Sequence, residues 1–234
     1  MKSVKNYLMT QDLSENIVHL ELASIADKSL MKTIIDYNIL QEVNSLGLNE
    51  QELLFLTYSS GQGPHSLYYE QLKGQPELHR IIDILEWTLN SLGNDKSKLT
   101  RIHFHCLMYH IIAEQESSNW SNTASALLSG AKIAGKQACG FEYADNTIND
   151  KLENLIEFQT AHLVDKDNNI LFEIEKNKFV KFNSSNPVIE FKRGNIRFYF
   201  TPVLVCKKPI KTVGLGDAIS SNALYYNEYR HVDL

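Results

Sequence analysis

The sequence predicts an α/β fold in which a mostly parallel sheet lies between two layers of helices. Residues 16–23 form a short apolar run, and residues 27–43 follow with apolar side chains at helical spacing. Residues 45–48 form a second apolar run, so these three segments have the order of a β-α-β unit. Near the end of the chain, an apolar run leads into a glycine turn, as at the ligand-binding edge of an α/β sheet.

Further regular elements continue this alternation of strands and helices. They are helices at residues 49–57, 78–92 and 120–139 and a strand at residues 99–107. Residues 187–193 and 196–202 flank Gly194 and Asn195, which predicts a β-hairpin. Residues 141–186 are rich in Asn, Asp and Lys, and we expect them to form a variable polar insertion made mainly of loops.

Composition limits the class of protein. With 234 residues, of which 43% are hydrophobic and 22% charged, the chain can bury a core of ordinary size in one large domain. A net charge of -5 and the lack of a Lys/Arg block exclude a nucleic-acid footprint. No apolar run approaches the ~20 residues of a membrane span, and no secretory signal is recognisable, so the chain as written is expected in the cytoplasm.

The glycine turn predicts an anion site that contains a base. Gly214 and Gly216 let the backbone turn tightly, and the amides of Leu215, Gly216 and Asp217 would point from a helix N-terminus toward a phosphoryl group. A bound phosphate repels Asp217 unless its carboxylate holds a metal or takes a proton from an attacking hydroxyl. The alternative is a plain tight turn in which Asp217 only favours the helix dipole.

Two glutamates are candidate metal-organising residues. His19 and Glu21 share a strand face near its carboxyl end, where ligands bind in α/β sheets, although taken alone the pattern is more typical of a solvent-facing carboxylate. Asn49 and Glu52 have the spacing of a capping box, which needs no ligand. The functional alternative is that Glu52 faces the cleft and helps to hold Mg²⁺ through water and substrate phosphates.

A histidine-rich strand offers a further candidate site. Arg101, His103 and His105 alternate on one face, and His110 lies just beyond them. Against a transition-metal site stand the lack of a carboxylate or cysteine ligand matched to these histidines and the frequency of strand histidines that only satisfy hydrogen bonds. We therefore favour a contact with phosphate or nucleotide, with His105 as the contact residue.

Four strings occur together in one order in this chain. They are HLELAS (residues 19–24), SLGLNEQELLFL (45–56), LTRIHFHCLMYHIIA (99–113) and TPVLVCKKPIKTVGLGDAIS (201–220). The combination closely resembles the ADP-dependent glucokinase and phosphofructokinase family of the ribokinase-like fold, especially its animal glucokinases. The resemblance covers most of the chain after residue 16 and implies a three-layer αβα architecture.

The resemblance implies transfer of the β-phosphoryl group of ADP to the 6-hydroxyl of glucose, which gives AMP and glucose 6-phosphate for glycolysis. Glu21 matches the family's HxE motif and Glu52 its NxxE motif. The implied roles are a catalytic base (Asp217), an anion hole (Gly214, Leu215 and Gly216), a nucleotide contact (His105) and carboxylates that organise Mg²⁺ (Glu21, Glu52 and Asp217). Residues 205–212 would form a wall of the adenine pocket.

This chain departs from the family pattern at its start. Family members carry a long N-terminal half with the first strands, a lid domain and most sugar contacts, whereas only residues 1–15 precede the first strand here. We therefore expect residues 1–234 to be the C-terminal part of a ribokinase-like domain that lacks its N-terminal strands and lid, a monomer with little or no activity alone. Full-length animal members are expected in the endoplasmic reticulum, where Cys139 and Cys206 would be able to pair.

Two other functions stay open on the sequence alone. One is a non-catalytic remnant that binds nucleotide or a protein partner. The other is an ATP-dependent sugar kinase of the ribokinase-like fold, which shares the glycine turn but does not predict the HLELAS and GLNEQE strings.

Overall fold

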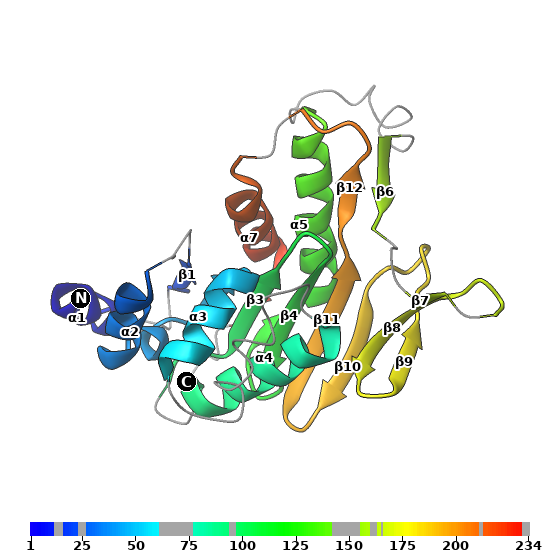
Figure 1. Ribbon diagram of the computed structural model, residues 1–234. Helices are drawn as coiled ribbons and strands as arrows, with labels where there is room; N and C mark the ends of the chain where they lie inside the picture. Colours follow the sequence, from blue (N-terminus) through cyan, green and yellow to red (C-terminus); the bar gives the residue numbers. More distant parts are fainter. Residues whose placement is uncertain are drawn as a thin grey trace.

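The computed structural model shows a fold organised around a six-stranded sheet (Figure 1). It describes residues 1–11, 16–22, 27–60, 77–93, 97–141, 155–159, 163–164, 166–210 and 213–230. The strand order of the sheet is β1-β2-β3-β4-β11-β10. The strands are β1 (His19–Glu21), β2 (Ser45–Leu48), β3 (Arg101–His105), β4 (Tyr109–Gln115), β11 (Ile196–Pro202) and β10 (Ile189–Arg193).

The sheet is mixed, with most strands running in one direction. β1 pairs in parallel with β2, and β2 pairs in parallel with β3. β4 is antiparallel to both β3 and β11, so β11 has the direction of β3, and β10 reverses again. Four of the six strands (β1, β2, β3 and β11) are therefore parallel, which confirms the predicted α/β class.

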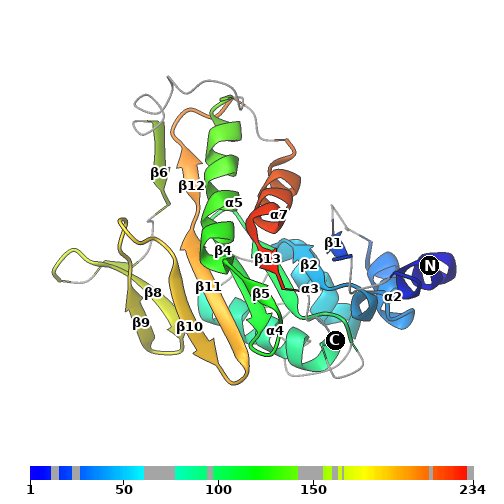
Figure 2. The ribbon, with the colours of Figure 1, turned by 180° about the vertical axis from the view of Figure 1, so that it is seen from behind.

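Helices cover both faces of this sheet (Figure 2). On β4, Ile111 and Ala113 belong to the main buried cluster, which includes side chains of α4 (Leu78–Leu92). Ile112, between them, packs in a second cluster with Leu127 of α5 (Thr123–Ala138). α7 (Leu215–Tyr226) packs along α5 and also contacts β3. Because successive strand residues point to opposite faces, this alternation establishes the three-layer arrangement.

The N-terminal helices follow the predicted order, with one difference. They are α1 (Lys2–Met9), α2 (Lys28–Asp36), the short 3-10 helix η1 (Ile39–Glu42) and α3 (Glu50–Ser60). Asp27 caps α2, because its carboxylate accepts a hydrogen bond from the Ser29 amide at 2.8 Å. The single helix predicted over residues 27–43 is wrong beyond Asp36, since Asn38 adopts a left-handed conformation with φ of 54° and breaks it.

β4 is the main element that the sequence does not predict. Residues 109–114 are all buried, because α4 and α5 cover the two faces of the strand. A strand with both faces covered lacks the alternation of apolar and polar side chains that marks a half-exposed strand. The helix predicted from residue 120 begins instead at Thr123, after β5 (Trp120–Ser121), which pairs with β13 (Glu228–Tyr229).

Short strands also occur within the predicted polar insertion. They are β6 (Ile156–Phe158), β7 (Leu163–Val164), β8 (Ile170–Glu175) and β9 (Lys178–Lys181). β8 contributes buried Phe172 and Ile174 to the core, whereas β6 pairs with β12 (Leu204–Cys206). Residues 142–154, 160–162 and 165 of this insertion lie outside the described residues. Among the helices that are described, none is long and apolar enough to cross a membrane.

Candidate functional site

The predicted site residues meet at the carboxyl edge of the parallel strands. β1 ends at Glu21, β2 is followed by Asn49, and β3 ends at His105. The N-terminus of α7 lies over the same edge, as expected for the ligand side of an α/β sheet. A cavity of about 240 Å³ is lined by Glu21, Leu22, Asn49, Glu52, His105, Gly214, Gly216 and Asp217.

Glu21 is held as a carboxylate by two histidines. His105 Nε2 lies 2.9 Å from Glu21 Oε1, and His19 Nε2 lies 3.3 Å from Oε2. Burial alone would raise the pKa of Glu21, but the hydrogen bonds with His105 and His19 outweigh it and lower the pKa to about 2. Glu21 is thus an ionised, half-buried group and not a freely solvated strand carboxylate.

Gly47, which is not among the predicted site residues, makes room for this carboxylate. A Cβ atom at Gly47 would lie 1.8 Å from Glu21 Oε2 and 3.0 Å from His19 Nε2. Gly47 pairs directly with Glu21 in the parallel ladder between β1 and β2. A glycine inside a fully buried strand is the signal that could have revealed it, because such a glycine often marks a close approach.

The ionised state of Glu21 gives a pH-dependent stability. Its folded pKa of about 2 lies below the ordinary value of 4.5, so ionisation stabilises the folded protein at pH values above 4.5. This contribution, about 3 kcal/mol, is lost as the pH falls from 4.5 toward 2. Denaturant unfolding in EDTA should therefore show that Glu21→Gln lowers the free energy of unfolding more at pH 7 than at pH 3. Exposed Glu190→Gln is the control, and an equal loss for Glu21→Gln at both pH values would contradict the assignment.

Glu52 takes the predicted capping position and also lines the cavity. Asn49 Oδ1 accepts hydrogen bonds from the amides of Gln51 and Glu52 at 2.9 and 3.0 Å. Glu52 Oε2 accepts one from the Asn49 amide at 2.9 Å, which completes a capping box at the start of α3. Glu52 is nevertheless buried and lines the same cavity as Glu21, so the cap also fixes a carboxylate toward the site.

The glycine turn has the predicted form over the residues described. Gly214 is the N-cap of α7 with φ of 77°, a left-handed conformation that favours glycine. A Cβ atom at Gly216 would lie 3.2 Å from His105 Cε1, so the turn packs closely against β3. Asp217 is exposed in the first turn of α7. Residues 211 and 212, at the start of the turn, lie outside the described residues.

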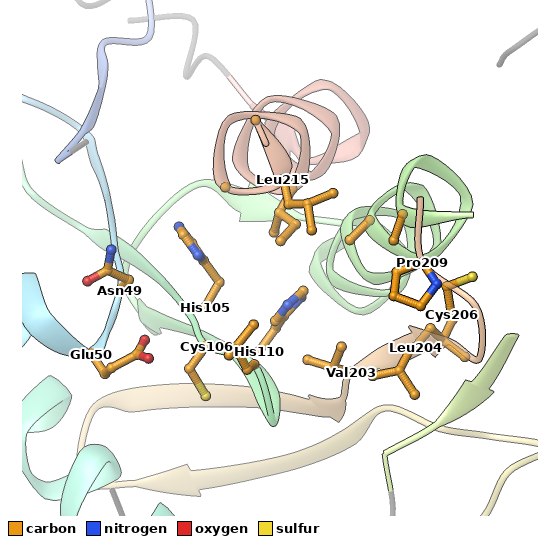
Figure 3. Close-up of a pocket in the computed structure, with 17 residues that line it drawn as sticks. Asn49, Glu50, His105, Cys106, His110, Val203, Leu204, Cys206, Pro209 and Leu215 are labelled. Carbon is orange, nitrogen blue, oxygen red and sulfur yellow. The ribbon is translucent and has the colours of Figure 1, made fainter. Parts of the chain in front are cut away.

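A larger, mostly apolar cavity adjoins the first. It has a volume of about 510 Å³ and shares Asn49, His105, Gly214 and Gly216 with the smaller cavity. Its other lining residues include Leu107, His110, Ala134, Val203, Leu204, Val205, Cys206, Pro209, Leu215 and Ile219. Figure 3 shows His105 and His110 near each other, with Leu215 of α7 above them. Together the cavities offer a charged end and an apolar end.

The histidines of β3 and β4 separate into different environments. His103 is fully buried, and its pKa lies well below the ordinary value because of desolvation and the nearby Arg101 charge. His110 lines the larger cavity, and burial followed by the influence of His105 lowers its pKa to about 3. Within the described residues, no three His, Cys, Asp or Glu side chains are arranged to hold one metal ion. Of the three predicted histidines, only His105 lines both cavities.

A disulfide closes the far side of the larger cavity. Cys139, directly after α5, is bonded to Cys206 at the end of β12, and their Cα atoms lie 5.5 Å apart. Cys206 and Ala138 both line the cavity. The bond therefore ties one wall of the cavity to the helix layer, and it joins the two cysteines whose pairing the family resemblance implies.

Loss of this disulfide should destabilise the protein measurably. The bond joins residues separated by 67 positions, so Cys139→Ser is expected to lower the free energy of unfolding by about 2–4 kcal/mol. Denaturant unfolding of the oxidised protein, with Cys106→Ser as the matched control, measures this difference. Mass spectrometry after non-reducing digestion should detect the linked peptides. An unchanged unfolding midpoint in the presence of reductant would contradict a stabilising role.

Comparisons with known proteins identify the family. The model of the ADP-specific phosphofructokinase/glucokinase conserved region matches residues 1–226. The chain is 45% identical over 214 residues to an ADP-dependent glucokinase of Bos taurus and 40% identical over 223 residues to a probable ADP-dependent glucokinase of Caenorhabditis elegans. These alignments cover 90% and 91% of this chain but only 40% and 41% of the relatives.

Solved structures agree with the fold. A phosphofructokinase from Pyrococcus horikoshii OT3, crystallised with AMP, superposes with a TM-score of 0.67 at 18% identity. The superposition covers 96% of this chain and 45% of that enzyme. This chain thus spans less than half the length of these kinases and contains the edge of the sheet where Glu21, Glu52 and Asp217 meet. It belongs to the ADP-specific phosphofructokinase/glucokinase family of kinases.

Proposed function

We propose that this chain supplies the nucleotide- and magnesium-binding part of an ADP-dependent glucokinase. The reaction transfers the β-phosphoryl group of ADP to the 6-hydroxyl of glucose and gives AMP and glucose 6-phosphate. One observation carries the proposal: Glu21, Glu52 and Asp217 line a single cavity beside a glycine turn. The adjoining apolar cavity, which includes the predicted adenine wall at Val205, has room for a nucleobase.

Asp217 is the proposed catalytic base. It takes the proton of the sugar hydroxyl as that oxygen attacks the β-phosphorus of ADP and AMP departs. Backbone amides at Leu215 and Gly216, in the first turn of α7, would stabilise negative charge on the phosphoryl oxygens. Phosphoryl transfer depends mainly on such positioning and electrostatic stabilisation, and a base orients the attacking hydroxyl.

The donor set of the cavity suits Mg²⁺. Glu21 is ionised, Glu52 is fixed by its capping box, and Asp217 lines the same space. Mg²⁺ in kinases is held by one or two carboxylates together with substrate phosphates and water. When bound, the ion would neutralise charge on the transferring phosphoryl group. Glu21 and Glu52 would organise it together with substrate phosphates and water, with Asp217 nearby, since among the described residues the protein side chains alone form no complete metal site.

Glucose is the proposed sugar because the bovine and worm relatives, at 45% and 40% identity, are named glucokinases. The sugar contacts and lid are proposed to lie in the part of the relatives that this chain does not span. We therefore expect the 234-residue chain to bind ADP but to show little or no glucose phosphorylation alone. The bridge between Cys139 and Cys206 supports placing the complete protein in an oxidising lumen such as the endoplasmic reticulum.

A coupled assay of AMP release with glucose tests this proposal directly. The complete kinase should release AMP with ADP as donor, whereas the 234-residue chain should not. Calorimetry should show Mg²⁺-dependent binding of ADP to the chain and weaker binding of ATP. ADP binding without turnover by the complete protein would favour a non-catalytic nucleotide-binding module. Preferential ATP binding would favour an ATP-dependent sugar kinase.

A further inference from the structure

A buried arginine links the helix that carries Asp217 to the strand that carries Glu21. Arg101, on β3, is fully buried. Its Nε donates a hydrogen bond to Asn227 Oδ1 at 2.8 Å, and its Nη1 donates one to Ser45 Oγ at 2.7 Å. Asn227 is the C-cap of α7, and Ser45 begins β2. The two arms of one guanidinium therefore hold two different elements of the site.

The hydrogen bonds continue from Ser45 to Glu21. Ser45 Oγ lies 2.9 Å from His19 Nδ1, and His19 Nε2 lies 3.3 Å from Glu21 Oε2. Every link has one donor and one acceptor if the Ser45 hydroxyl, which accepts from Arg101, donates to His19 Nδ1 and His19 carries its proton on Nε2. The chain of donors then runs in one direction, from Arg101 to the carboxylate of Glu21.

The other end of this chain is anchored to α5. Asn227 Nδ2 donates to the carbonyl oxygen of Ser121 at 2.8 Å and to Thr123 Oγ1 at 3.2 Å. Thr123 Oγ1 donates in turn to Glu114 Oε2 at 2.8 Å. Burial lowers the pKa of Arg101 to about 10, and the charges of Glu114 and Glu21 oppose that effect, so Arg101 stays charged at neutral pH.

We propose that Arg101 is a positioning residue for phosphoryl transfer, which fixes the carboxylate of Glu21 relative to the helix that carries Asp217. The inference rests on the proposed function and extends it. The contacts of Arg101 explain why an arginine is buried here despite the cost of desolvation. Its planar guanidinium donates hydrogen bonds to Asn227 and Ser45 at once, and a lysine ammonium does not reproduce that geometry. A purely structural role is the competing explanation, since Arg101 also lies 5.3 Å from the Trp120 ring centroid.

Ser45→Ala provides the sharpest test, because it removes only the hydroxyl between Arg101 and His19. Thr88→Val is the matched control, since Thr88 on α4 is also fully buried and donates one hydroxyl hydrogen bond, to the Ile84 carbonyl at 2.8 Å. The first measurement is hydrogen exchange of the Leu22 amide, which bonds the Gly47 carbonyl at 2.9 Å. The second is the ratio of ADP affinities with Mg²⁺ and with EDTA.

Ser45→Ala should speed exchange at Leu22 about tenfold and reduce the Mg²⁺-dependent gain in ADP affinity about tenfold, with affinity in EDTA unchanged. Arg101→Lys should do the same and should also speed exchange at the Asn227 amide, because it loses both arms. Thr88→Val should not change the Mg²⁺-dependent gain in ADP affinity. It should speed exchange at the Leu22 and Asn227 amides only as far as its own loss of global stability accounts for.

The proposal is overturned if Ser45→Ala changes neither quantity more than Thr88→Val does. If the unaltered chain binds no ADP, the proposed function fails. Hydrogen exchange of the Leu22 amide in the Arg101→Lys variant then still decides whether Arg101 supports β1. Unchanged exchange at Leu22 in that variant would also overturn the inference.

Discussion

Asp217→Asn is expected to reduce turnover of the complete kinase about 10³-fold while ADP affinity changes by less than about threefold. The amide keeps the size of the side chain and the exposed position in the first turn of α7, but it cannot accept the proton of the attacking hydroxyl. The loss should therefore appear in kcat and not in the KM for ADP. Steady-state kinetics with glucose measure both.

The control for this prediction is Glu228→Gln, which removes an exposed carboxylate just beyond the other end of α7. It should leave kcat within about twofold, as is usual for surface substitutions. Retention of more than a tenth of normal turnover in Asp217→Asn would refute the assignment of the base.

Gly47→Ala is expected to lower Mg²⁺-dependent turnover about 10²-fold, because misplacement of a catalytic group by ~1 Å has an effect of that size. The new Cβ would lie 1.8 Å from Glu21 Oε2, so the carboxylate must leave its position. The nearest atom is the end of a flexible side chain, and we therefore expect a smaller effect on stability, about 1–3 kcal/mol. Kinetics at several Mg²⁺ concentrations and denaturant unfolding separate the two effects.

A double-mutant cycle supplies the control for Gly47→Ala. In a Glu21→Ala background no carboxylate is left to displace, so adding Gly47→Ala should cause little further loss of turnover. Additive losses would show that Gly47 acts through something other than Glu21. A normal Mg²⁺ dependence in the single Gly47→Ala variant would contradict the proposed role of Glu21.

The parts of the site that the sequence could predict are those whose signal is local. The glycine turn, the capping box of Asn49 and the pair of His19 and Glu21 each lie within a few residues, and the cavity brings their carboxylates together. Their roles in catalysis and metal binding stay predictions. The parallel pairing of β1 with β2 followed from the order of apolar runs alone.

The remaining features depend on contacts between distant residues. The bond from Arg101 to Asn227 spans 126 positions, and no short window of sequence contains both partners. β4 was missed because burial on both faces removes the alternation that reveals a strand. Gly47 was missed because its importance comes from a side chain on the neighbouring strand.

β1 has only three residues, and in the described part of the chain it pairs on one side alone, with β2. The carboxylate that contacts two histidines thus sits on a strand with little backbone support. Short segments of this kind open locally at low free-energy cost. Any strand that docks on the free side of β1 would hold Glu21 in place before nucleotide arrives and would tighten Mg²⁺ and ADP binding. By reciprocity, bound nucleotide would favour that docking, so completion of the sheet and readiness for catalysis become thermodynamically coupled.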